Sequence, residues 1–194
     1  DSGPVKMPVA LIDILAGHQL KEGLLEALLM RAKMNSEAIK ISVSLYDAAL
    51  ASLANQATNY LIAKHTPKRI GSKHPNIAPY GELFQTSDQR TITFAIGSDQ
   101  QFNQLIDLLG VDELKKFESN QSRVQHRTEI EQALQNKVAG WKADDLLSAC
   151  IERMIPAAII RNLNEILNDE QVQKLLLEDE IGKRLRTAIY KIES

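Results

Sequence analysis

This sequence has little cysteine, no long apolar run and no excess of basic charge. Cys150 is the single cysteine in 194 residues, which excludes an internal disulfide. No apolar run approaches the roughly 18 to 20 residues that span a bilayer. The net charge is -2, and scattered Lys and Arg residues leave no basic footprint. We therefore expect a globular protein of a reducing, cytoplasmic compartment, with neither nucleic acid nor a membrane as its partner.

Familiar catalytic and cofactor motifs are also missing. The sequence contains no dinucleotide fingerprint, phosphate-binding P-loop or nucleophile elbow. Its four histidines are too dispersed to suggest a metal site: His18, His65, His74 and His126. We therefore expect no bound metal, and we interpret Cys150, within a predicted helix, as a packed thiol.

Arg123 and Arg127 lie one turn apart on a predicted helix. This spacing allows the two guanidinium groups to clamp an anion together. An exposed helix face carrying Glu129 and Glu131 explains the pair equally well.

The first third of the chain predicts a helix, a strand and a second helix. Three-and-four spacing of apolar residues predicts helices over Pro8–Lys33 and Asp47–Ala63. Between them, Ala38–Leu45 alternates apolar with polar residues and is rich in β-branched ones, which predicts a strand. From His65 to Glu82 prolines and glycines break any periodicity, which indicates a loop or linker.

The remainder predicts a small domain with a short sheet and several helices. We expect a hairpin from Glu82–Gln85 and Thr91–Ile96, and later a short strand over Ala157–Ile160. The expected helices are those of residues 99–109, capped by Ser98 or Asp99, and of 122–138, 142–154 and 163–167. Thr187–Ile192 is expected to be a final strand. The fold class is therefore α/β, in two domains.

Asp13 is the one charge within the apolar run Val9–Gly17. Burying an unpaired carboxylate costs on the order of several kcal/mol, so such an aspartate is a helix cap, an exposed residue or a functional group. Gly17 follows one turn later on the same face. A glycine inside a helix is typical of close approach by a backbone or a ligand, or of simple helix packing.

An ordered set of segments resembles the class III coenzyme A transferase family, the superfamily of formyl-CoA transferase and α-methylacyl-CoA racemase. The segments are Leu11–Gly17, Val43–Leu50, His74–Tyr80, Ile92–Gly97, Gln100–Phe102, Leu108–Gly110, Asn120–Arg127 and Ile155–Asn162. The likeness runs from about Val5 to Ile192 and concerns the C-terminal portion of the family. The chain begins with Asp1 rather than Met, and we expect it to be a fragment without the N-terminal CoA-binding half.

The resemblance implies a division of the chain. Residues 1–64 correspond to the distal, helix-strand-helix end of a Rossmann-like large domain that carries the catalytic aspartate. Residues 65–82 form a linker or loop, 83–162 the small α/β domain, and 163–194 a segment returning towards the large domain. Family members form interlocked homodimers, which implies a homodimer here.

The family resemblance also implies a reaction mechanism. Asp13 matches the catalytic aspartate, which attacks an acyl-CoA to give a mixed anhydride and then an aspartyl-CoA thioester. Gly17 leaves room for the thioester, and His74 and Asn76 lie in a loop that resembles one folding over the active site. The partners implied are acyl-CoA and a carboxylic acid acceptor; coenzyme A serves as a substrate, with no tightly bound cofactor.

Two alternatives stay open. The same aspartate serves as an acid/base group in α-methylacyl-CoA racemase, so the sequence is also compatible with a racemase. A noncatalytic assembly module derived from the fold is the third hypothesis.

Overall fold

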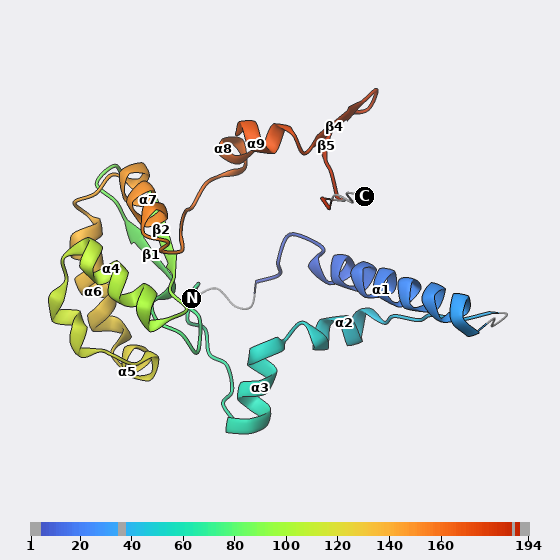
Figure 1. Cartoon of the computed structure of the whole chain (residues 1–194), viewed down its shortest axis with the longest axis horizontal. Coiled ribbons are helices and arrows are strands. Elements are labelled where there is room, and N and C mark those ends of the chain that lie inside the picture. The colour runs from blue at the N-terminus through green and yellow to red at the C-terminus, as the bar shows by residue number, and fades with distance from the viewer. Residues whose placement is uncertain (1–4, 35–37, 188, 191–194) are drawn as a thin grey trace. The chain divides into compact units, whose positions relative to one another are not determined.

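The computed structural model describes residues 5–34, 38–187 and 189–190. The chain divides into two compact units, residues 1–69 and 70–194 (Figure 1). Each unit is described separately below.

The described residues of the first unit form the helices α1 (Leu11–Met34), α2 (Leu45–Ala51) and α3 (Ala54–Ala63), and α1 packs against α2. Apolar residues lie on all sides of α1, and many of the large ones are exposed: Leu11, Ile14, Leu20, Leu24, Leu25, Leu28, Leu29 and Met30. The described residues therefore leave much of its apolar surface uncovered.

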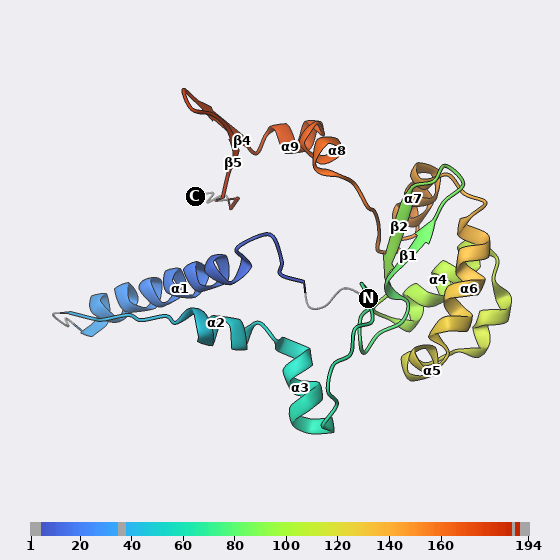
Figure 2. The same ribbon diagram turned by 180° about the vertical axis from the view of Figure 1, so that it is seen from behind.

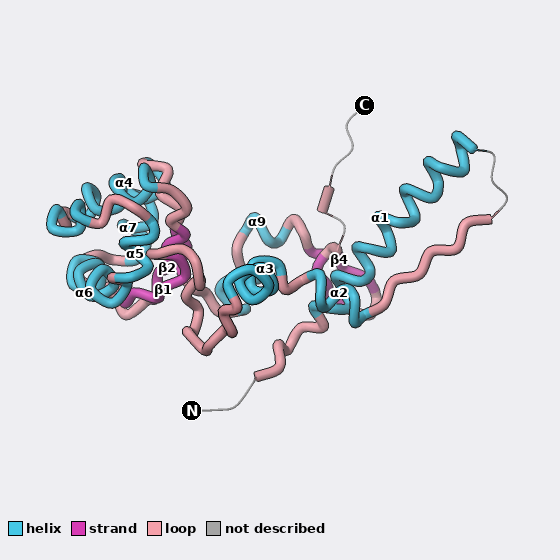
Figure 3. The backbone as a smooth tube through the Cα atoms, turned by 90° about the horizontal axis from the view of Figure 1, so that it is seen from below, coloured by secondary structure: helices cyan, strands magenta, loops and turns pink. Residues whose placement is uncertain are grey.

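The strand predicted over Ala38–Leu45 is wrong. Residues 38–44 have no regular secondary structure (Figure 3), and Leu45 already belongs to α2. The Ser44 side chain caps that helix by accepting a hydrogen bond from the Asp47 backbone N–H at 3.1 Å. Alternation predicts an extended chain, but a strand also needs a neighbour, and no described segment pairs with this one.

Two of the predicted helices are interrupted. The Asp47–Ala63 prediction is divided between α2 and α3, because Ala54 has a φ of +43°. The 122–138 prediction is divided into α5 (Asn120–Gln125) and α6 (Arg127–Val138), with His126 between them. The apolar pattern continues across both breaks, so periodicity did not reveal them.

The second unit is built on an antiparallel sheet in the order β1 (Tyr80–Gln85), β2 (Thr91–Ala95) and β3 (Ala157–Ile159). The predicted hairpin and short strand are confirmed. Two further helices are α4 (Asp99–Leu109) and α7 (Ala143–Glu152). In Figures 1 and 2, α4 and α6 lie on the same side of the sheet.

The core of this unit lies between one face of the sheet and the helices. Phe84, Ile92 and Phe94 are fully buried there. The helices and the unpredicted 3-10 helix η1 (Asp112–Lys116) contribute the other large side chains: Phe102, Leu105, Ile106, Leu114, Ile130, Leu134 and Leu146. The predicted boundaries of α4 are confirmed, because the Ser98 hydroxyl caps its start and Gly110, at φ +64°, ends it. The α/β class is confirmed.

The C-terminal part only partly follows prediction. Helix α8 (Leu163–Leu167) is confirmed and begins with a capping box. Helix α9 (Glu170–Gln173) and the hairpin of β4 (Leu176–Asp179) and β5 (Gly182–Leu185) were not predicted. The predicted strand 187–192 falls partly on residues 188, 191 and 192, outside the described residues, and its described positions are not in a strand. The missed signal was the turn residues Asp179 and Gly182.

Gly81 is expected to be less tolerant of substitution than Gly110. Both have positive φ, +87° and +64°, so alanine at either site costs about 1 to 2 kcal/mol in backbone strain. At Gly81 a Cβ would also meet the Ser72 carbonyl oxygen at 2.2 Å, whereas nothing lies within 4 Å at Gly110. Urea unfolding followed by Trp141 fluorescence should show a larger loss of stability for Gly81→Ala than for Gly110→Ala. Equal losses would contradict the close backbone approach.

Candidate functional site

Asp13 lies in the first turn of α1, and its side chain is exposed. A negative charge in this turn interacts favourably with the helix dipole, which accounts for the residue without a catalytic role. Gly17 is also exposed, and nothing lies within 4 Å of a Cβ built there. The described chain thus provides neither burial of Asp13 nor a close neighbour at Gly17. Their assignment to the active site stays a prediction.

A cavity of about 340 Å³ lies in the first unit between α1, residues 41–44 and α2. Its lining includes Gly23, Ile41 and Asp47. Gly23 makes room for the chain here, because a Cβ at this position would meet the Ile41 side chain at 3.0 Å. Asp13 does not line this cavity.

Residues 72–81 of the second unit, hereafter the 72–81 loop, fold back on themselves. The Ser72 hydroxyl donates to the Gly81 carbonyl at 2.5 Å, and the His74 N–H donates to the Tyr80 carbonyl at 2.8 Å. The ends of the loop therefore lie together, in the manner of a compact Ω-loop.

Asn120 and Arg123 of α5 attach this loop to the helices. The Asn120 side-chain amide accepts from the Ala78 N–H at 3.2 Å and donates to the Asn76 carbonyl at 2.8 Å. Arg123 donates from Nε to the Ala78 carbonyl at 3.1 Å. Loop backbone groups that would otherwise need water are thus paired by side chains from α5.

Arg123 is almost wholly buried, at 2% exposure. Its guanidinium group also donates to the carbonyls of Phe117 at 3.2 Å and Glu118 at 3.0 Å, and pairs with Asp99 at 2.5 Å. It lies over the Phe102 ring, 4.6 Å from the centroid. One side chain therefore links the loop, the start of α4 and the start of α5.

Arg127, at the start of α6, attaches the other side of the loop. It donates to the carbonyls of His74 at 2.7 Å and Ile77 at 2.9 Å, and pairs with the carboxylate of Glu82. Glu82 is 1% exposed, and its second carboxylate oxygen has no hydrogen-bond partner in the described chain. Arg127 therefore both holds the loop and compensates a buried charge.

The two sequence interpretations of Arg123 and Arg127 are therefore both wrong. The pair neither lies on an exposed face nor turns jointly to an external anion, because backbone carbonyls and internal carboxylates occupy both guanidinium groups. The spacing of Asn120, Arg123 and Arg127 places three polar side chains on neighbouring turns. That spacing was the available signal, but their partners in the 72–81 loop lie over 40 residues away in the sequence.

The 72–81 loop orients the imidazole of His74. Its Nδ1 accepts a hydrogen bond from the Asn76 backbone N–H at 3.1 Å, and the ring lies 5.1 Å from that of Tyr80. An imidazole that accepts at Nδ1 carries its proton on Nε2. His74 is half-buried and Asn76 is exposed. Their predicted place in an active-site loop is not tested by these contacts and stays a prediction.

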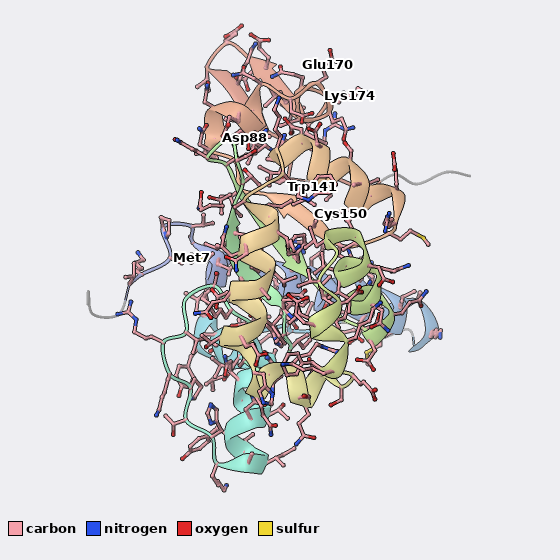
Figure 4. The ribbon with its side chains drawn as sticks, turned by 90° about the vertical axis from the view of Figure 1, so that its left-hand side faces the viewer. Met7, Asp88, Trp141, Cys150, Glu170 and Lys174 are labelled. Carbon is pink, nitrogen blue, oxygen red and sulfur yellow. The ribbon has the colours of Figure 1, made fainter. Side chains whose placement is uncertain are left out.

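Cys150 is completely buried in α7 (Figure 4). Burial raises the pKa of its thiol to about 11, so the nucleophilic thiolate is scarce at neutral pH. The packed-thiol interpretation is thus confirmed. Over the described ranges, no three His, Cys, Asp or Glu side chains cluster as metal ligands do, and no helix is long and apolar enough to cross a membrane.

The fold is thus an α/β architecture whose small sheet supports a rigidly attached loop. Residues 1–188 match CoA-transferase family III, and the chain belongs to this family. The family resemblance of the sequence is confirmed.

The chain is also similar to proteins that are named as CoA-transferases. The chain is 37% identical over 176 residues to the succinate–glutarate CoA-transferase of Agrobacterium fabrum, covering 89% of this chain and 43% of that protein. It is 30% identical over 175 residues to the succinyl-CoA:glutarate CoA-transferase of Mus musculus, covering 89% and 39%. The chain thus spans less than half the length of these relatives.

A solved structure agrees with the fold. The crystal structure of a CAIB/BAIF family protein from Brucella suis is 36% identical to this chain, with a TM-score of 0.70. The match covers 98% of this chain and 51% of the other.

Proposed function

We propose that the protein containing this chain transfers coenzyme A between carboxylic acids, with the dicarboxylic acids succinate and glutarate as its substrate class. The observation that carries the proposal is the match of residues 1–188 to CoA-transferase family III. The names of the two relatives supply the acids and favour transfer over racemisation.

The proposed reaction uses an enzyme carboxylate as nucleophile. The carboxylate oxygen attacks the thioester carbon of the donor acyl-CoA, the C–S bond breaks, and CoA thiolate leaves. The thiolate then attacks the enzyme side of the resulting anhydride, which releases the donor acid and leaves an enzyme-CoA thioester. The acceptor carboxylate repeats these two steps in reverse order, forming its own CoA ester and restoring the enzyme carboxylate. No oxidant or reductant is required.

Asp13 is the carboxylate we propose for this role, with Gly17 beside the thioester. The family resemblance of Leu11–Gly17 supports the assignment. Asp13 is exposed in the described chain, so the proposal requires further structure that desolvates its carboxylate. The uncovered apolar side chains of α1 support packing of this unit against further structure. We propose that this includes the remainder of a Rossmann-like large domain and a second subunit of a homodimer.

Transfer is tested with the protein expressed from the complete open reading frame that contains this sequence. Incubation with succinyl-CoA and glutarate should produce glutaryl-CoA and succinate in equal amounts, measured by liquid chromatography and mass spectrometry. Hydrolysis of succinyl-CoA without glutaryl-CoA formation would exclude the transferase proposal.

The nucleophile is identified by trapping. With succinyl-CoA and hydroxylamine, we expect a hydroxamate on the peptide that contains Asp13, because hydroxylamine cleaves both an anhydride and a thioester of a carboxylate. Asp13→Asn should abolish the label. Asp47→Asn is the matched control, because Asp47 is likewise an exposed aspartate in the first turn of a helix of this unit. A label that appears on another carboxylate, or that survives Asp13→Asn, would reassign the nucleophile while leaving the transferase proposal intact.

A further inference from the structure

The imidazole of His74 is a half-buried polar group with one ring nitrogen occupied and the other available. Asn76 N–H occupies Nδ1, and no described group is hydrogen-bonded to Nε2. The ring therefore presents its N–H donor at Nε2. Protonation at Nδ1 would break the bond to Asn76.

The backbone on both sides of this imidazole is also held. His74 donates from its N–H to Tyr80 and accepts at its carbonyl from Arg127. The Asn76 carbonyl is held by Asn120, and that of Ile77 by Arg127. Side chains that are distant in the sequence thus restrict a short loop, and such ordering costs conformational entropy. These contacts hold the backbone on both sides of the imidazole in one conformation.

A dicarboxylic acid substrate presents a second group besides the one that reacts. After one carboxylate has formed the thioester, the other remains an anion that must be bound and distinguished from an alkyl end. A fixed N–H donor suits a carboxylate oxygen, and hydrogen bonds to charged groups are the stronger ones.

We propose that His74 donates a hydrogen bond from Nε2 to the nonreacting carboxylate of a dicarboxylic acid, and that Asn120 and Arg127 act as positioning residues for it through the 72–81 loop. This inference rests on the proposed transferase function. It gives His74 a role in selecting which acid binds as the substrate.

Kinetics of the complete protein test the assignment by comparing glutarate with pentanoate, an acid of the same chain length with one carboxylate. His74→Phe should raise the KM for glutarate about tenfold or more, the value of one hydrogen bond to a charged group, with a far smaller effect on the kinetics with pentanoate. His74→Gln retains a donor near the same position and should restore part of the loss. His65→Ala, an exposed histidine outside the loop, is the control. Equal effects of His74→Phe on both acids, or no effect on either, would overturn the proposal.

A separate kinetic measurement tests the positioning role of Asn120. Asn120→Ala removes the hydrogen bonds to Asn76 and Ala78 without removing the imidazole, and it should raise the KM for glutarate more than that for pentanoate. Equal changes with the two acids would show a structural role only.

A measurement that needs no catalytic turnover tests this inference independently of the proposed function. Nitrogen NMR of the histidine-labelled complete protein should show His74 with its proton on Nε2, and glutarate alone should shift that proton's resonance more than pentanoate does. This result would stand even if no CoA transfer were found. A His74 that carries its proton on Nδ1 or that ignores glutarate would refute the inference, whatever the transferase assay shows.

Discussion

Arg123→Leu is expected to lower the free energy of unfolding of the second unit by about 3 to 5 kcal/mol. The guanidinium group is 2% exposed and pairs with the backbone carbonyls of Ala78, Phe117 and Glu118. Leucine leaves these buried acceptors without donors, and each such loss costs about 1 to 3 kcal/mol. Asp99 contributes less, because its carboxylate is 65% exposed and water can replace the arginine.

Urea unfolding of the 194-residue chain measures this loss. Trp141, the single tryptophan of this sequence, packs against the core of the second unit, so its fluorescence reports on that unit. Arg90→Leu is the control, because Arg90 forms an exposed ion pair with Asp144, and its loss should cost about 1 kcal/mol or less. Arg123→Lys should also destabilise, because a single ammonium group lacks the planar fork. A stability within about 1 kcal/mol of wild type for Arg123→Leu would contradict the proposed importance of these bonds.

Arg127→Met is expected to lower the free energy of unfolding by about 3 to 5 kcal/mol, for a different reason. The substitution leaves the carboxylate of Glu82 buried at 1% exposure without its cation, and its other oxygen already lacks a partner in the described chain. Two loop carbonyls, of His74 and Ile77, lose their donor as well.

A double-mutant cycle isolates the buried pair. Glu82→Gln removes the charge, so the double variant Glu82→Gln/Arg127→Met should be less destabilised than the sum of the single variants, by about 1 to 3 kcal/mol. The same cycle on Lys73 and Glu131, whose side chains are about one-third exposed, should give a coupling below about 1 kcal/mol. Additive effects at Glu82 and Arg127 would show that the ion pair does not compensate the buried charge.

Much of the second unit could be predicted from local patterns. The alternation in Thr91–Ala95 places Ile92 and Phe94 on the buried face, and both are fully buried. Ser98 and Gly110 mark the two ends of α4 by capping preferences that act within a few residues. The ordered segments also identified the family.

Less of the candidate site could be predicted from local sequence patterns. The predicted role of Asp13 came from resemblance, and the exposed side chain in the first turn of α1 adds no support from its surroundings. The tautomer of His74 followed from a single backbone contact that no residue spacing specifies.

Local sequence was sufficient for the α/β class, most elements of the second unit and the family, because periodicity, caps and turns depend on neighbouring residues. Tertiary contacts decided the rest. Residues 38–44 alternate as a strand does yet remain unpaired, since pairing requires a neighbouring strand that the described chain does not provide. Arg123 and Arg127 resembled a surface pair on a helix and instead hold a loop that lies over 40 residues away in the sequence. Those partners are set by packing, which brings a distant backbone within reach of a buried guanidinium group.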